Sequence, residues 1–107
     1  MRRLRPPGHL AKTSRDLWRA LVNDYRIDDA GGLAILTSGC EALDRATEAR
    51  KQIDADGMTI VDRFGVKKGH PLLAAERDAR SGFLQAMRAL NLDLEPLRDG
   101  PGRPPGR

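Results

Sequence analysis

The chain is poor in aromatic residues and has a single cysteine. Aromatic side chains make up 4% of its 107 residues. Sandwiches and barrels draw on aromatic and β-branched side chains, so this composition favours packed helices. One cysteine excludes an intramolecular disulfide and a zinc site built from several cysteines. Cys40 lies among the apolar positions of a helical pattern, which predicts a core residue rather than a reactive thiol.

Long apolar runs are also missing from the sequence. No stretch approaches the roughly 18 to 20 apolar residues that a membrane span needs. The basic N-terminus is not followed by the apolar segment of a secretory signal. We therefore expect a soluble protein of the cytoplasm that makes no contact with a membrane.

The sequence carries no recognisable catalytic or cofactor motif. Neither GxxxxGK[ST] nor GxGxxG occurs, so residues 65–69 predict a basic turn rather than a phosphate cradle. His9 and His70 have no cysteine or carboxylate at the spacing of metal ligands. The carboxylates alternate with arginines on helix faces, as on ordinary solvated surfaces. These features predict a protein that is not an enzyme and that uses no metal and no cofactor.

Basic residues are plentiful and gather at the two ends of the chain. Lysine and arginine number 19 against 15 acidic residues, and neither residues 1–12 nor residues 100–107 contain an acid. Basic ends of this kind predict flexible arms that meet a polyanion, with nucleic acid as the first candidate. The alternative is that they are only solubilising disorder. The basic residues that we expect to contact DNA are Arg2, Arg3, Arg5, Lys12, Arg15, Lys67, Lys68, Arg103 and Arg107.

Three amphipathic helices are predicted in the middle of the chain, within one domain over residues 13–97. Apolar residues recur at steps of three and four over about 13–25, 30–55 and 71–91. The fold class is therefore mainly α, a three-helix core with flexible basic ends at 1–12 and 98–107. The side chains expected in the core or in contacts between subunits are Trp18, Leu21, Tyr25, Leu36, Leu43, Phe83, Met87 and Leu90.

Capping residues predict where the first two helices begin and end. Thr13 or Ser14 is the expected N-cap of the first helix. Asp28 or Asp29 is the expected cap of the second, and Gly57 is its expected stop.

Residues 58–67 form the one stretch with β character. They predict a short hairpin or an extended excursion, with a turn at residues 63–65. Pro71 then suits the first turn of the third helix, where its missing N–H costs nothing. Asn91 tolerates the left-handed conformation and is the expected stop of that helix.

A series of short motifs follows in order along nearly the whole chain. These motifs are Pro7-Gly8-His9-Leu10, Trp18 and Tyr25, Leu43 to Arg50, Ile53 and Gly57, Gly65 to Pro71, Glu76 and Arg80, Leu90-Asn91-Leu92, and Gly102 to Gly106. Together they resemble the small subunit of phage DNA-packaging terminases, in the branch of siphophage-type phages and prophages. The chain has Leu90-Asn91-Leu92 where that family often has Leu-Gly-Leu, and it is shorter at both ends than many members.

The resemblance implies a non-catalytic DNA-binding subunit. Such proteins assemble as an oligomeric ring, bind double-stranded viral DNA at the packaging site and hand it to the terminase large subunit, in the cytoplasm of the host cell. The residues alone leave two alternatives open. One is a helical protein-binding adaptor with inert basic ends. The other is a small helix-turn-helix transcription regulator that uses the link from Tyr25 to Gly32, although the second helix is long for a recognition helix.

Overall fold

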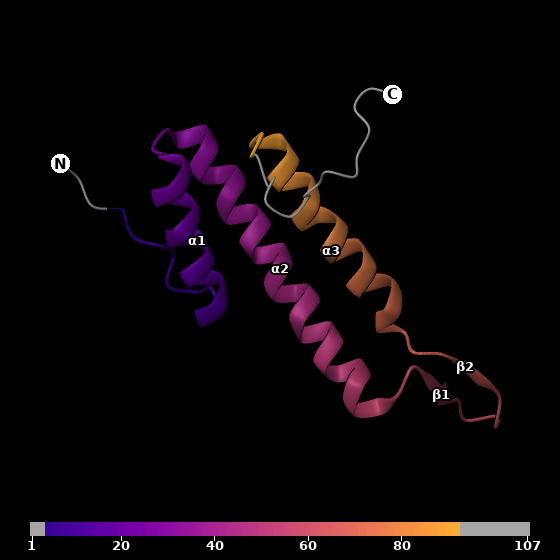
Figure 1. Cartoon of the computed structure of the whole chain (residues 1–107). Coiled ribbons are helices and arrows are strands. Elements are labelled where there is room, and N and C mark those ends of the chain that lie inside the picture. Colours follow the sequence, from indigo (N-terminus) through magenta and orange to yellow (C-terminus); the bar gives the residue numbers. More distant parts are fainter. Residues whose placement is uncertain (1–3, 93–107) are drawn as a thin grey trace, which may run out of the picture.

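The structure is a computed structural model that describes residues 4–92. It is mainly helical with one short hairpin, as predicted (Figure 1). In chain order its elements are α1 (Lys12–Tyr25), α2 (Ala30–Asp56), β1 (Thr59–Val61), β2 (Lys67–Gly69) and α3 (Leu72–Ala89). The predicted tail at 98–107 lies outside the described residues.

Helices α2 and α3 run side by side as an antiparallel pair, and α1 packs against the N-terminal half of α2 (Figure 1). Small residues let the pair approach closely. A Cβ added at Gly39 would lie 2.7 Å from the Cβ of Ala86. The hairpin continues from the far end of the pair, beyond the reach of α1.

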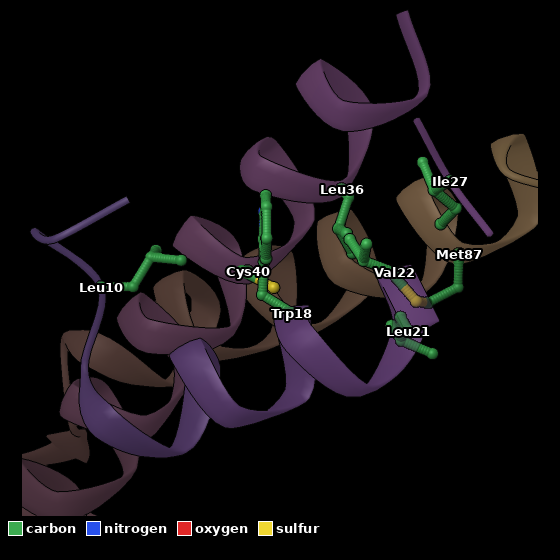
Figure 2. Packing of buried hydrophobic residues seen from close by; sticks show 8 residues of the cluster. All are labelled: Leu10, Trp18, Leu21, Val22, Ile27, Leu36, Cys40 and Met87. Atoms are coloured by element: carbon green, nitrogen blue, oxygen red, sulfur yellow. The ribbon is translucent and has the colours of Figure 1, made fainter. Parts of the chain in front are cut away.

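The hydrophobic core lies where α1, the first half of α2 and the second half of α3 meet. Leu36 and Cys40 of α2 are completely buried there. The buried cluster comprises Leu10, Trp18, Leu21, Val22, Ile27, Leu36, Cys40 and Met87 (Figure 2). The other half of the α2/α3 pair buries mainly Ala46, Ala49 and Ile53 between its helices. One compact end of the molecule thus supports a two-helix extension.

The predicted ends of α2 are confirmed. Asp29 is the N-cap, and its side chain accepts the N–H of Gly32 at 2.8 Å. Gly57 follows the last turn with φ at 89°, a conformation that favours glycine. Asn91, the predicted stop of α3, also has positive φ, at 59°.

The start of α1 differs from the prediction. The helix begins at Lys12, and its N-cap is Ala11, which makes no side-chain capping bond. Ser14 is buried, and its hydroxyl donates to Asp44 of α2 instead of capping its own helix. The same carboxylate accepts the N–H of Ala11 at 2.9 Å. Asp44 therefore ties the start of α1 to α2, although no side chain caps the first turn of the helix.

The N-terminal segment, residues 4–11, lies against α2. The prediction placed residues 1–12 outside the domain, whereas Leu10 is a core residue at 1% exposure. His9 Nε2 also lies 2.7 Å from Glu41 Oε2. Burial of one leucine and the bonds to α2 fix this segment, which contains Arg5.

The hairpin turn is organised by Asp62. Its Oδ1 accepts the backbone N–H groups of Phe64 at 2.8 Å and Val66 at 3.0 Å. Gly65 supplies the positive φ of the turn, at 81°. Strand β2 pairs antiparallel with β1, so residues 67–69, predicted as a basic turn, are a strand. The turn at 63–65 brings this stretch opposite β1, which explains the difference.

His70 fastens the base of the hairpin to both long helices. Its ring is buried, and Nε2 lies 2.8 Å from Asp56 Oδ2 at the end of α2. Its Nδ1 accepts the N–H of Leu72 in the first turn of α3, at 3.0 Å. Since Nδ1 accepts, Nε2 carries the proton and donates to the carboxylate. The hairpin is therefore anchored to the helices at its base.

Glu76 joins the two long helices. It is buried, and its carboxylate accepts hydrogen bonds from Arg80 and from Arg50 of α2, each at 3.1 Å. The bonds from Arg80 and then Arg50 hold the pKa of Glu76 below its ordinary value. The resulting stabilisation is present above the unfolded pKa of about 4.3. It is lost as the pH falls through the lower folded pKa.

We expect Glu76→Gln to make the fold less sensitive to acid. The variant should be less stable than the wild type near neutral pH, and the gap should close as the pH falls below about 4.3, because protonation then removes the same charge from the wild type. Urea unfolding at several pH values measures the gap. Asp54→Asn is the matched control, since Asp54 of α2 is exposed and has no ion pair among residues 4–92. A gap that stayed constant down to low pH would contradict the prediction.

Candidate nucleic-acid interface

Arginines from two parts of the chain line one groove beside α1. Arg5 comes from the N-terminal segment, and Arg15 and Arg19 come from α1. The groove has a volume of about 680 Å³. It is lined by Leu4, Arg5, Pro6, Arg15, Trp18, Arg19, Val22 and Asn23. We call it the arginine groove.

Helix periodicity and one backbone contact set the positions of these arginines. Arg15 and Arg19 are four residues apart, so they lie on the same side of α1. Arg15 Nη1 also donates to the backbone carbonyl of Leu10 at 2.5 Å. Because Leu10 is buried, this bond fixes the chain that leads back to Arg5. The gathering of the three arginines along one groove is thus a product of tertiary structure.

The charge beside the groove is predominantly positive. Asp16 is the acid on this stretch of α1, and it pairs with Lys12 at 2.9 Å and Arg19 at 3.5 Å. The hydrogen bond from Lys12 is the main cause that lowers the pKa of Asp16. These exposed pairs contribute little to stability. Three cations surround this carboxylate, namely Lys12, Arg15 and Arg19, and Arg5 also lines the groove. The resulting excess of positive charge suits an anionic ligand.

Guanidinium groups are well matched to phosphate oxygens. Each presents a planar fork of N–H donors that can bind two oxygens at once. Trp18 lies at the groove, but it is 4% exposed and its indole N–H donates to Thr37 at 3.2 Å. It therefore supports the arginines as a core anchor and offers no open face for a base to stack on.

The predicted DNA-binding residues do not form one patch. Arg5, Lys12 and Arg15 lie in or beside the arginine groove. Lys67 and Lys68 lie on β2 at the opposite end of the molecule, where Lys68 pairs with Asp62 at 3.4 Å (Figure 1). The remaining four lie outside the described residues: Arg2, Arg3, Arg103 and Arg107.

Arg19 was not among the predicted DNA-binding residues. Its four-residue spacing from Arg15, which places both arginines on one side of the helix, was the available signal. That spacing alone does not separate a binding face from an ordinary solvated one. Arg19 differs from an ordinary surface arginine because the N-terminal segment lies beside α1 and forms a groove with it.

Four of the eight residues predicted to lie in the core or in subunit contacts are buried. Trp18, Leu21, Leu36 and Met87 are in the core cluster. Three others are half-buried, namely Leu43, Phe83 and Leu90. Tyr25 is 36% exposed. It is the last residue of α1, where Arg26 turns the chain in the left-handed conformation, so its side chain lies at the edge of the core.

The single cysteine, Cys40, is a buried thiol. Burial, assisted by the charge of Asp44, raises the pKa of the Cys40 thiol to about 11, so the thiol stays protonated near neutral pH. Across residues 4–92, no group of three or more histidine, cysteine or acidic residues is placed to hold a metal ion. None of the three described helices combines the length and the apolar character of a membrane span.

Known proteins add no further guide to the groove. Comparisons of the chain with protein-family models, with curated proteins and with solved structures found no match. The three convergent arginines and the order of the sequence motifs are therefore the basis for assigning a function.

Proposed function

We propose that the chain is the non-catalytic small subunit of a phage DNA-packaging terminase. In this proposal it binds double-stranded viral DNA as an oligomeric ring and hands it to the terminase large subunit. The observation that carries the DNA-binding part is the convergence of Arg5, Arg15 and Arg19 on one groove. The assignment to phage packaging rests on the sequence motifs that resemble this family.

The arginine groove suits the DNA backbone better than the base edges. Contacts to phosphates fix the position and orientation of a protein but carry no sequence information. Selection of a packaging site then draws on the shape and deformability of the DNA. One groove supplies three arginines, which is few for tight binding. A ring multiplies the contacts along one duplex and raises the overall affinity.

The helix-turn-helix alternative is not favoured by the packing of α2. The link between α1 and α2 is short, but α2 is 27 residues long. Gly32, Leu36 and Cys40 in its first half are buried. α2 thus serves as the long central helix of the core, whereas a helix-turn-helix joins two short helices through a tight turn. The measurement of DNA binding described next separates the protein-binding adaptor from the DNA-binding subunit.

We expect the double variant Arg5→Ala, Arg19→Ala to bind duplex DNA about tenfold or more weakly at low salt. Each charge-assisted contact that is lost is worth roughly 1 kcal/mol or more. The slope of log affinity against log salt should fall by about 2, since each phosphate contact contributes about 0.9. Fluorescence anisotropy between about 50 and 200 mM salt gives both quantities. Arg15 is left in place because it holds Leu10.

The matched control is Arg77→Ala, Arg88→Ala, which removes the same charge from exposed positions on α3. Its salt slope should equal that of the wild type. Equal losses in both double variants would show an effect of net charge and would contradict a role for the groove. A wild-type chain that ignores DNA at low salt yet retains a large protein partner would favour the adaptor.

A further inference from the structure

The hairpin exposes large apolar side chains far from the core. Phe64 is 76% exposed, and Met58, Val61 and Val66 are each more than half exposed. A two-stranded hairpin has little stability of its own, and a gathering of exposed apolar side chains is typical of a contact surface. These residues stand at the end of the molecule opposite α1 (Figure 1).

The hairpin tip, residues 62–66, is already held in one conformation. Asp62 accepts the N–H groups of Phe64 and Val66, which closes the turn. The guanidinium carbon of Arg63 lies 5.1 Å from the centre of the Phe64 ring. At the base, the buried His70 bonds to Asp56. A pre-organised element loses little conformational entropy when it binds, which favours its use in an interface.

An apolar groove of about 380 Å³ lies between α2 and α3. Its floor is formed by Ala49, Leu72 and Ala75. The charged residues that line it are Asp44, Arg45 and Glu48. Asp44 is engaged by Ser14 and Ala11, whereas Glu48 has no ion pair among residues 4–92. We call this the α2/α3 groove, and its rim carries more negative than positive charge.

We propose that the hairpin tip of one copy docks in the α2/α3 groove of a second copy, with Phe64 on the apolar floor and Arg63 facing Glu48. The tip carries an aromatic ring beside a cation, and the groove offers an apolar floor beside a free carboxylate. The charges and the apolar surfaces are complementary, which favours this orientation over a contact between two equally basic tips.

A chain does not fill its own groove, because both strands lead away from the helix pair (Figure 1). Tip and groove are different surfaces, so the contact is heterologous and joins copies head to tail. A head-to-tail contact closes into a ring when its rotation permits. The inference rests on the proposed function, since it names the surfaces that would build the ring.

Cysteine trapping tests the docking directly. One sample carries Val66→Cys, which keeps Phe64, and another carries Ala75→Cys on the groove floor. Cys40 is completely buried and should stay out of the reaction. After mild oxidation, we expect a disulfide-linked dimer in the mixture and in neither sample alone. A dimer in the Val66→Cys sample alone would indicate contact between two hairpins and would overturn the proposal, as would the absence of any crosslink.

Charge reversal gives a second test that does not depend on a crosslink. Arg63→Glu and Glu48→Arg should each lower the mass seen by light scattering, and the combined variant should restore it. A combined variant as weakly associated as either single one would overturn the pairing. Neither measurement uses DNA. A chain that binds DNA through Arg5 and Arg19 but fails both tests would overturn the docking alone and leave the DNA-binding role intact.

Discussion

Replacing Trp18 by alanine is expected to destabilise the domain by about 3 to 5 kcal/mol. Trp18 is 4% exposed and packs between α1 and α2 in the core cluster (Figure 2). Its indole N–H also donates to Thr37 of α2 at 3.2 Å. Alanine would leave a cavity and an unpaired hydroxyl at the contact that holds α1. In a small domain a loss of this size is a large share of the total stability.

Urea unfolding followed by circular dichroism measures this loss, because the variant lacks the single tryptophan of the chain. Trp18→Phe is the matched control. It keeps most of the apolar volume and loses the bond to Thr37, so it should cost clearly less than the alanine variant. If both substitutions shifted the unfolding midpoint equally, the hydrogen bond and not the packing would be the main contribution. An alanine variant as stable as the wild type would contradict the placement of Trp18.

The elements of the fold could be predicted where their signals are local. Asp29 and Gly57 mark the two ends of α2, because a cap depends on residues within one turn of the helix. Gly65 marks the hairpin turn for the same reason. The spacing of apolar residues placed Trp18 and Met87 in the core, and both are buried.

The differences arise where a partner from a distant part of the chain decides the outcome. Ser14 looks like a cap, but it bonds to Asp44, which lies thirty residues further along. Leu10 was assigned to a flexible end, yet α2 and α1 bury it. Arg19 lines a groove only because the N-terminal segment lies beside α1. Side-chain spacing within one helix does not contain such information.

The structure also separates two groups of basic residues that the sequence treated alike. Arg5 and Arg15 belong to the arginine groove at the α1 end. Lys67 and Lys68 belong to the hairpin at the other end (Figure 1). The proposed roles follow this division, with DNA contacts at the α1 end and contacts between copies at the hairpin end. Each role can then be removed by substitutions that leave the other in place.

The same substitution at two glycines of the α2/α3 pair should have opposite effects. Gly39→Ala is expected to cost about 1 to 3 kcal/mol, because the added methyl group would lie 2.7 Å from the Cβ of Ala86 and 3.3 Å from the Cε of Met87. At Gly82 the nearest atom, the Cβ of Ala42, would be 3.6 Å away, an ordinary contact. Gly82→Ala should therefore stabilise the protein by about 0.5 to 1 kcal/mol through helix propensity.

Urea unfolding of both variants measures the two changes in the free energy of unfolding. The comparison is direct because alanine replaces glycine at both sites. The single variant Ala86→Gly and the double variant Gly39→Ala, Ala86→Gly complete a cycle, since Ala86→Gly removes the atom that the new methyl group would meet. The cost of the double variant should be less than the sum of the two single costs, because the two sites are in contact. If Gly39→Ala were as stabilising as Gly82→Ala, the helices would not approach as closely as Gly39 permits. The close packing of α2 on α3, which also shapes the α2/α3 groove, would then be contradicted.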